Sequence, residues 1–288
     1  MKGIILAGGN GTRLKPLTSI INKHMLPIYD KPMIYYPLSV FMLAGIRDIL
    51  IIVNKNDIEY YKKLLGDGSN LGINLSYEIQ QSADGIAQSF IIGKRFIGNS
   101  KVSLILGDNI FFGYKFSDLL SDAVKLNSGS LVLTNYVKNP NEFAICELDN
   151  NGKVISIEEK PKNPKSNLAV TGLYFYDNDV IKIAEDLKPS KRGELEITDI
   201  NKTYLKNGKL EALYLGRGFA WLDTGSHQSL LDAGNFVRTI EERQGLKIAC
   251  LEEISFNKGW IDENNLIKQI EKFNNSPYSN YLKILLNK

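Results

Sequence analysis

The sequence has little of the chemistry on which many enzymes depend, because only two His and two Cys occur among its 288 residues. His24 and His227 lie far apart in the sequence, so local spacing supports neither an imidazole-rich metal site nor a paired-His acid/base site. Cys146 and Cys250 form no CxxC pair and are too few for a disulfide scaffold, which favours a reducing compartment and two buried thiols. Any catalysis by this chain is therefore predicted to proceed without histidine.

Long hydrophobic runs and a strong charge of either sign are also missing. No segment approaches the ~18 consecutive apolar residues of a membrane span, and the apolar stretch from Ile4 to Ala7 is too short for a signal-peptide core. The formal net charge is only +3, which disfavours nucleic acid as the main partner. With 43% hydrophobic and 23% charged residues, the composition is that of a globular protein. We therefore expect a soluble, cytoplasmic protein with no membrane partner.

The apolar pattern of the first half predicts an α/β fold with three layers. Uniformly apolar stretches rich in β-branched residues are typical of buried, mostly parallel strands, and they alternate with stretches of helical spacing. The expected strands are Ile4–Leu6, Ile49–Val53, Leu75–Ile79, Val102–Leu106 and Leu131–Val137. The expected helices are Met33–Ala44, Asp57–Leu65, Gly85–Phe96 and Phe116–Leu126. This alternation predicts a largely parallel central sheet flanked by helices.

The second half is more mixed. Two predicted strands, Phe143–Leu148 and Val154–Glu158, flank Asn151-Gly152, a pair that favours the positive φ angles of a tight hairpin turn. The other expected elements are strands at Val170–Tyr176 and Leu210–Leu215, a helix at Ile197–Leu205 capped by Thr198, a helix at Ser226–Gln244 capped by its Ser, and further helices from Ile261 to Leu286. Without a linker or a repeat, we expect one domain over residues 1–288.

A glycine-rich turn follows the first predicted strand, with the sequence Gly8-Gly9-Asn10-Gly11-Thr12-Arg13. Glycines at the carboxyl end of a buried strand let backbone N–H groups approach a phosphate, although a simple turn is the alternative. Two common phosphate loops do not fit: the GxGxxG pattern fails at Leu14, and no Gly-Lys-Ser/Thr follows these glycines. A nicotinamide enzyme and a P-loop NTPase are therefore disfavoured.

The residues after this turn carry a family resemblance. The turn continues as Arg13-Leu14-Lys15-Pro16-Leu17-Thr18, and Lys23-His24-Met25-Leu26-Pro27 follows. The sequence thereby resembles the sugar-1-phosphate nucleotidylyltransferases, whose signature is GGxGTRLxPxT followed by K-x-x-L-P, and it is most similar to their thymidylyl-transferring branch. Matching segments follow in order along nearly the whole chain, at 29–39, 106–109, 158–161, 193–199, 221–225 and 243–247.

The resemblance implies a reaction in which a sugar-1-phosphate oxygen attacks the α-phosphorus of a nucleoside triphosphate and releases diphosphate. It implies dTTP and glucose 1-phosphate as substrates, dTDP-glucose for deoxysugar and surface polysaccharide synthesis as product, Mg²⁺ as cofactor, and a homotetramer. Such a nucleophile is already ionised at pH 7, so no general base is required, in agreement with the scarcity of His. UTP in place of dTTP stays open, as does another sugar-1-phosphate nucleotidylyltransferase activity or a non-catalytic nucleotide-binding subunit.

Five residues are implied as catalytic. Asp108 follows the predicted strand Val102–Leu106, and Asp223 follows Trp221-Leu222 before a Thr-Gly turn, at another expected strand end. Both would bind Mg²⁺, although a turn or helix cap is the alternative for an isolated Asp. By the resemblance, Arg13 and Lys23 bind the triphosphate and the leaving diphosphate. Lys160 would bind the sugar phosphate.

The binding residues implied by the resemblance fall into two groups. The nucleotide is expected to contact Gly8, Gly9, Gly11, Thr12, Arg13, Lys23, Gln80, Gly85 and Asp108. The sugar phosphate is expected to contact Phe143, Ala144, Glu159, Lys160 and Val170. The amide of Gln80 offers both a donor and an acceptor to a pyrimidine edge. Residues 1–137 would thus be a nucleotide-binding half, 138–225 a sugar-phosphate-binding half with a β-hairpin insertion in a Rossmann-like fold, and 226–288 a C-terminal helical region.

The chain departs from the usual family pattern at three places. Phe143-Ala144 stands where Tyr-Gly is usual, which removes a phenol hydroxyl near the expected sugar site. His24 stands where Gln is common, and Gln80-Gln81-Ser82-Ala83 replaces Gln-Pro-Ser-Pro. None of these departures changes an expected Mg²⁺ ligand or one of the expected phosphate-binding cations Arg13, Lys23 and Lys160.

Overall fold

A computed structural model describes residues 1–286, and within them the chain folds as the α/β protein predicted from the apolar pattern. The last two residues of the predicted C-terminal helical region lie outside this part. The strands are β1 Lys2–Ala7, β2 Pro27–Ile28, β3 Lys31–Pro32, β4 Asp48–Asn54, β5 Asn74–Gln80, β6 Val102–Leu106, β7 Asn109–Gly113, β8 Ser130–Tyr136, β9 Ala144–Leu148, β10 Val154–Glu159, β11 Leu168–Tyr176, β12 Leu210–Tyr214 and β13 Phe219–Asp223.

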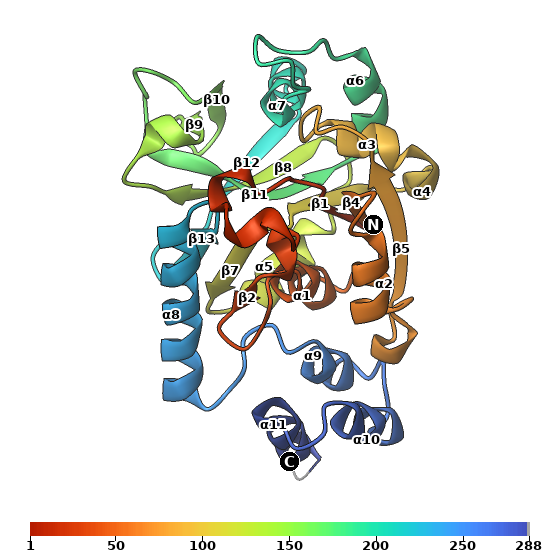
Figure 1. Ribbon diagram of the computed structural model, residues 1–288. Coiled ribbons are helices and arrows are strands. Elements are labelled where there is room, and N and C mark those ends of the chain that lie inside the picture. The colour runs from red at the N-terminus through yellow and green to blue at the C-terminus, as the bar shows by residue number, and fades with distance from the viewer. Residues whose placement is uncertain (287–288) are drawn as a thin grey trace.

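Nine of these strands form the central sheet (Figure 1). Strands β6, β1, β4 and β5 lie side by side and parallel, as the largely apolar sequences of β6, β1 and β4 predict, whereas β5 at the edge also carries polar residues. Strand β11 continues the sheet antiparallel to β6 and also pairs with β8 and β9. The parallel strands place their carboxyl ends at one edge, where ligands of open α/β sheets bind.

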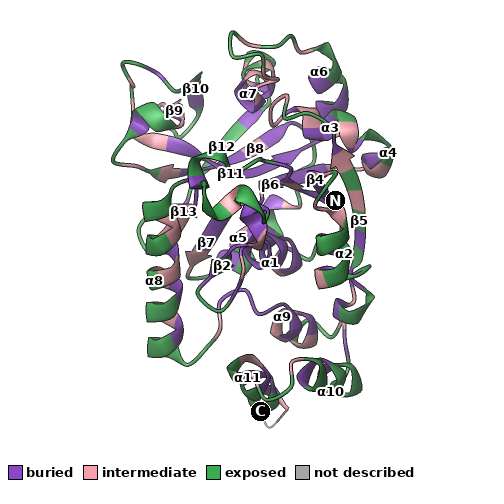
Figure 2. Cartoon of the chain, viewed as in Figure 1, coloured by how far each residue is buried: buried purple, intermediate pink, exposed green. Residues whose placement is uncertain are grey.

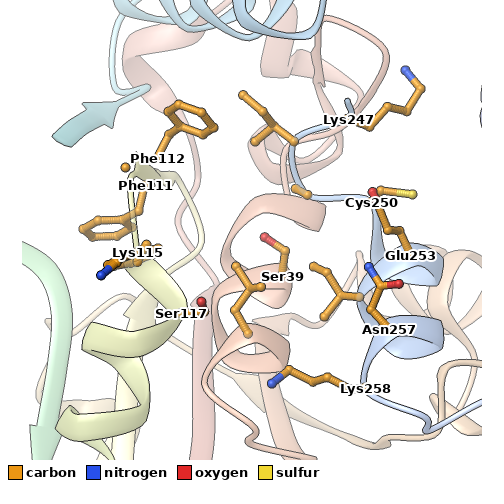
Figure 3. A pocket seen from close by; sticks show the side chains of 16 residues that line it. Ser39, Phe111, Phe112, Lys115, Ser117, Lys247, Cys250, Glu253, Asn257 and Lys258 are labelled. Carbon is orange, nitrogen blue, oxygen red and sulfur yellow. The ribbon is translucent and has the colours of Figure 1, made fainter. Parts of the chain in front are cut away.

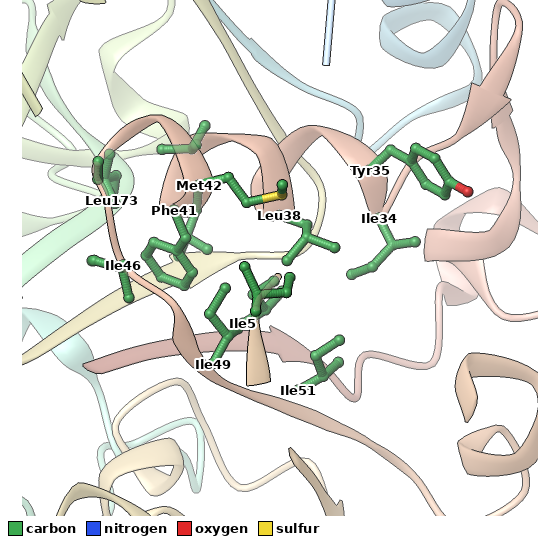
Figure 4. Close-up of a cluster of buried hydrophobic side chains, with 14 of the residues drawn as sticks. Ile5, Ile34, Tyr35, Leu38, Phe41, Met42, Ile46, Ile49, Ile51 and Leu173 are labelled. Atoms are coloured by element: carbon green, nitrogen blue, oxygen red, sulfur yellow. The ribbon is translucent and has the colours of Figure 1, made fainter. Parts of the chain in front are cut away.

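The strands of this sheet alternate their side chains between two hydrophobic cores. Ile5, Ile49 and Ile51 point into the core beneath helix α1 (Tyr35–Leu43), as Figure 4 shows. Their neighbours Ile4 and Leu50 point into the core on the opposite face. Because both faces are buried (Figure 2), the architecture has three layers.

Helices cover both faces and extend the fold at its C-terminal end. After α1 they are α2 Ile58–Leu65, α3 Gln88–Ile92, α4 Lys94–Ile97, α5 Phe116–Ala123, α6 Val180–Asp186, α7 Ile197–Lys206, α8 His227–Gln244, α9 Leu251–Asn257, α10 Glu263–Lys272 and α11 Pro277–Leu285. The last three gather below the sheet in Figure 1. No helix within residues 1–286 has both the length and the apolar character to cross a membrane.

Three local predictions need correction. The expected helix 85–96 is two short helices, α3 and α4, that meet at Gly93, a residue of low helix propensity. Thr198 does not cap α7; Glu196 holds the cap position, and the Thr198 hydroxyl donates to Glu159 instead. The turn between β9 and β10 has positive φ only at Gly152 and is held by Asp149, so it is longer than the expected Asn-Gly turn.

The long helix α8 begins as predicted. Ser226 accepts a hydrogen bond from the backbone N–H of Ser229, and the Ser229 hydroxyl accepts from the N–H of Ser226 in return. Sequence analysis did not predict helices α6 and α9, the short strands β2 and β3, or the pairing of β7 with β13. This pair is an antiparallel sheet of its own, apart from the central sheet, and it has a direct effect on the site.

Candidate active site

The glycine-rich loop begins at Gly8, directly after β1, and lies against the end of β5. A Cβ at Gly8 would stand 2.2 Å from Oε1 of Gln80, so only glycine allows this close approach. Gly11 has a φ of 58°, and a Cβ there would meet Thr18 and Lys23. The loop conformation therefore depends on these two glycines, and it brings the backbone of the predicted phosphate site next to Gln80.

Lys23 and Asp108 form an ion pair in which Nζ and Oδ2 lie 2.5 Å apart. The Lys23 side chain is almost fully buried, whereas the carboxylate of Asp108 keeps partial access to solvent. Burial acts to raise the pKa of Asp108, but the ammonium of Lys23 outweighs it and lowers the pKa below its usual value. Asp108 is therefore held ionised, as a metal or phosphate site requires.

Asp223 ends β13 and is brought to Asp108 by the pairing of β13 with β7. In this ladder Asp223 lies opposite Asn109. The backbone N–H and the hydroxyl of Thr224 both donate to the carbonyl of Asp108, over 3.2 and 2.9 Å. Burial raises the pKa of Asp223, and the negative charge of the nearby Asp108 raises it further. A cation between them would relieve this repulsion.

Asn109 is a site residue that sequence analysis missed, and it is 3% exposed. Its Nδ2 donates to Oδ1 of Asp108 over 2.9 Å. Its Oδ1 accepts from Nε1 of Trp221 over 2.6 Å and from the N–H of Gly172 over 3.1 Å. Asn109 thus ties Asp108 to β13 and to β11, and its position directly after Asp108 was the one available signal.

A cleft of about 270 Å³ brings together most of the predicted triphosphate residues. Its lining includes Gly9, Gly11, Thr12, Arg13, Lys23, His24 and Asp108. A neighbouring hollow of about 390 Å³ shares Gly9 with this cleft and contains Gln80 at its wall. Gly85, with a φ of 108°, packs against the backbone of Leu195, where a Cβ would come within 2.4 Å of the carbonyl oxygen. Most of the predicted nucleotide residues therefore line two adjoining hollows, whereas Gly8 and Gly85 line neither.

His24 occupies the floor of the cleft as a buried side chain. Its Nδ1 lies 2.9 Å from Oδ1 of Asn22, and its ring packs against Gly107. Burial lowers the pKa of His24 to about 4, although the nearby Asp108 acts in the opposite direction. His24 is therefore neutral at pH 7 and adds no charge to the site.

The predicted sugar-phosphate residues lie on the β9–β10 hairpin and on β11. Lys160 directly follows β10 with a φ of 44°, an uncommon conformation for a residue other than glycine. Its backbone N–H donates to the carbonyl of Phe143, and the ring of Phe143 meets Trp221 edge to face at 5.3 Å. Ala144 begins β9. This group does not line the triphosphate cleft, but Trp221 and Asn109 connect it to Asp108.

Glu159 has one polar neighbour in the first turn of α7 and another in the loop before this helix. The Thr198 hydroxyl donates to its Oε2 over 2.6 Å, and the Arg192 guanidinium lies 3.8 Å from its Oε1. Burial raises the pKa of Tyr174, and the negative charges of Glu159 and Asp108 raise it further. Val170 is buried on β11, and the register of the pairing between β11 and β8 shifts between Val170 and Tyr174. Arg192 was missed, because a single Arg in a loop carries no pattern.

A cavity of about 480 Å³, larger than either hollow of the candidate site, holds none of the predicted site residues. Figure 3 shows Phe111, Phe112 and Lys115 on one side and Cys250, Glu253 and Asn257 on the other, with Ser39 of α1 between them. It lies apart from the glycine loop, so size alone does not locate the catalytic residues.

The chemistry supported by this arrangement is phosphoryl or nucleotidyl transfer. Backbone amides and cations surround the cleft at the carboxyl ends of β1 and β6, and two carboxylates converge at its rim. The one imidazole in the lining, His24, is buried and bonded to Asn22 rather than to a hydroxyl or a thiol, so the site suits a reaction whose nucleophile is already charged.

The fold and this site define a nucleotide-processing enzyme, and comparison with known proteins gives its family. The model of the nucleotidyl transferase family matches residues 2–240. The chain belongs to the nucleotidyl transferase family, which confirms the resemblance carried by its motifs.

Individual relatives extend over the full length. The chain is 55% identical over 288 residues, 100% of both chains, to glucose-1-phosphate thymidylyltransferase of Neisseria meningitidis serogroup A. It is 52% identical over 286 residues, 99% of both chains, to the enzyme of that name from Mycobacterium tuberculosis.

Two solved structures are also similar to this chain. A Bacillus anthracis structure described as a glucose-1-phosphate thymidylyltransferase has 43% identity and a TM-score of 0.77, covering 83% of this chain and 95% of that one. A UDP-glucose pyrophosphorylase in complex with UDP-glucose has 28% identity and a TM-score of 0.72, covering 83% and 98%.

Proposed function

We propose that this protein is a glucose-1-phosphate thymidylyltransferase, which converts dTTP and glucose 1-phosphate into dTDP-glucose and diphosphate. Full-length relatives of this name at 52–55% identity carry the proposal. The retention of Arg13, Lys23, Asp108, Lys160 and Asp223 supports a catalytic protein over a non-catalytic nucleotide-binding subunit. A homotetramer and a cytoplasmic location stay predictions of the family resemblance.

The residues present fit a bound Mg²⁺. Asp108 and Asp223 offer hard carboxylate oxygens. The pKa of Asp223 is raised by burial and then by repulsion from Asp108, and a divalent cation would remove this repulsion. Within residues 1–286 no group of three or more His, Cys, Asp or Glu converges on one point. Two protein ligands leave the other positions to phosphate oxygens and water, which is usual for Mg²⁺ at nucleotide sites. When bound, the ion would neutralise charge on the phosphates.

The chain's own residues would align two phosphates that repel each other. Amides of the glycine loop and the exposed guanidinium of Arg13 would bind the triphosphate, with Lys23 beside it. Lys160 would hold the sugar phosphate so that its oxygen faces the α-phosphorus, opposite the leaving diphosphate. Glu159 would accept sugar hydroxyls. Arg192 lies close enough to Glu159 to reach an anion bound beside it.

A screen for diphosphate release tests the proposal, with dTTP, UTP, CTP and ATP each offered with several hexose 1-phosphates. The expected result is highest kcat/KM for dTTP with glucose 1-phosphate. UTP is the second candidate, because the UDP-glucose pyrophosphorylase structure shares this fold at 28% identity. Thymine and uracil differ by one methyl group, which supports a discrimination of about 10- to 200-fold. No release with any pair would contradict the function.

Two variants test the placement of the residues. Asp223→Asn should keep the fold and remove most diphosphate release, and an unchanged rate at saturating Mg²⁺ would exclude a metal role. Lys160→Ala should mainly raise the KM for glucose 1-phosphate. An effect confined to dTTP would show that Lys160 serves the nucleotide instead.

A further inference from the structure

Three polar side chains form a relay of hydrogen bonds beside the glycine loop. Oδ2 of Asp84 accepts from Nε2 of Gln88 over 2.9 Å, and Oε1 of Gln88 accepts from Nε2 of Gln80 over 2.7 Å. Gln80 ends β5, Gln88 begins α3, and Asp84 lies in the connection between them. The relay therefore joins a residue at the wall of the nucleotide site to a carboxylate outside it.

The carboxylate determines the direction of the whole relay. An ionised Asp accepts hydrogen bonds and cannot donate them, so the NH₂ group of Gln88 must face Asp84. The oxygen of Gln88 then faces Gln80, which must turn its own NH₂ group toward Gln88. The amide oxygen of Gln80 is left at the glycine loop, in the place where a Cβ at Gly8 would lie 2.2 Å away.

We propose that Asp84 and Gln88 are positioning residues that make Gln80 present an acceptor to the nucleobase, and that they thereby exclude cytosine. The proposal rests on the proposed function, which places a pyrimidine beside Gln80. Thymine and uracil carry a hydrogen on N3 and can donate it to Oε1 of Gln80. Cytosine has a lone pair on N3, so two acceptors would face each other and a buried hydrogen bond would be lost. Such a loss corresponds to about 10- to 100-fold in affinity.

A purely structural role for the relay makes a different prediction. The backbone carbonyl of Asp84 also accepts a hydrogen bond from Leu195 over 2.6 Å, so this segment contributes to local packing. If Asp84 only held the segment in place, its loss would weaken the binding of all nucleotides alike. If Asp84 sets the direction of the relay, its loss should strengthen the binding of cytosine nucleotides in particular.

The variant Asp84→Asn separates these roles, because an Asn of the same shape can donate to Gln88 and let the relay reverse. We expect the Kd for dCTP, measured by isothermal titration calorimetry with MgCl₂, to fall at least about 10-fold, while that for dTTP changes little. Ser82→Ala is the matched control. It removes the other hydrogen bond to Asp84, from the Ser82 hydroxyl, and leaves the direction unchanged.

The double variant Asp84→Asn with Gln88→Glu moves the carboxylate one step along the relay. Glu at position 88 again accepts from Gln80, so selectivity for dTTP should return to that of the parent. Gln88→Leu serves if Asp84→Asn fails to fold, because it frees the Gln80 amide to rotate and should also improve dCTP binding. Restoration by the double variant is a result that local packing does not predict.

The binding measurement is independent of turnover, so the two hypotheses can fail separately. Absence of diphosphate release would contradict the proposed function but would leave the dTTP and dCTP affinities to test the relay. Equal affinities of the parent protein for dTTP and dCTP would overturn the relay. So would an unchanged ratio in Asp84→Asn, or a double variant that remains unselective.

Discussion

Glu241, on α8, is the buried carboxylate whose loss we expect to destabilise this fold most. Its Oε1 accepts from Nζ of Lys31 and from the backbone N–H of Ile248, both over 2.9 Å, and its Oε2 accepts from Nζ of Lys247 over 3.1 Å. Asp30 bonds both lysines from the other side. The cluster holds two positive and two negative charges and is neutral as a whole.

The variant Glu241→Gln keeps the shape of this side chain and removes its charge. Because the Lys31 side chain is only 2% exposed, it cannot recover water as a partner. Breaking a buried pair from one side costs about 3–5 kcal/mol. For a chain of this length, such a loss corresponds to a decrease in Tm of about 5–10 °C.

Thermal and urea unfolding followed by circular dichroism measure this loss, and the next residue supplies the control. Glu242 makes an exposed ion pair with Arg238 at 3.5 Å, so Glu242→Gln should change stability by less than about 1 kcal/mol. Adding Lys31→Met to Glu241→Gln restores neutrality and should recover part of the stability. If Glu241→Gln and Glu242→Gln unfold within about 1 kcal/mol of each other, the reasoning from burial is wrong.

Three further outcomes can be measured. Gly172→Ala places a Cβ 2.4 Å from Oδ1 of Asn109. We therefore expect the free energy of unfolding in urea to fall by about 1–3 kcal/mol and diphosphate release to slow. An unchanged stability and an unchanged rate would show that Asn109 moves freely. Burial raises the pKa of Cys146 to about 12 and that of Cys250 higher still, so a thiol reagent at pH 8 should label neither until the protein unfolds. The pKa of His24 is about 4 in the fold and about 6.5 when unfolded. As the pH falls from 7 to 4, wild type should therefore lose about 3 kcal/mol of unfolding free energy relative to His24→Gln. Parallel acid unfolding curves of the two proteins would contradict a neutral imidazole at this site.

The sequence predicted the central strands well, because their burial leaves a strong pattern. Both faces of β1, β4 and β6 lie against hydrophobic cores, so their sequences are apolar throughout, and the predicted ranges fall within two residues of the observed ones. The β7–β13 pair carries no such pattern. Its partners are distant in sequence, and the pairing depends on tertiary contacts that no local window contains.

The candidate site was predicted as a set of residues, but its connections were not. Motifs identified Lys23 and Asp108, and the structure brings them into an ion pair. Asn109 escaped notice because its role depends on the indole of Trp221 and on the backbone of β11, which only folding brings near. Arg192 became visible only through its distance to Glu159. Local patterns identify residue types, whereas convergence of distant segments gives them their roles.

The small β7–β13 sheet also has a consequence for the order in which the molecule becomes active. Asp108 follows β6 of the central sheet, whereas Asp223 arrives only when β13 pairs with β7 across a long stretch of chain. Contacts of such sequence separation form late, because loop closure precedes them. A refolding chain would therefore regain its local helices before it regains the paired carboxylates. A protein truncated before β13 would resemble the native fold in its first half yet lack half of its proposed metal site.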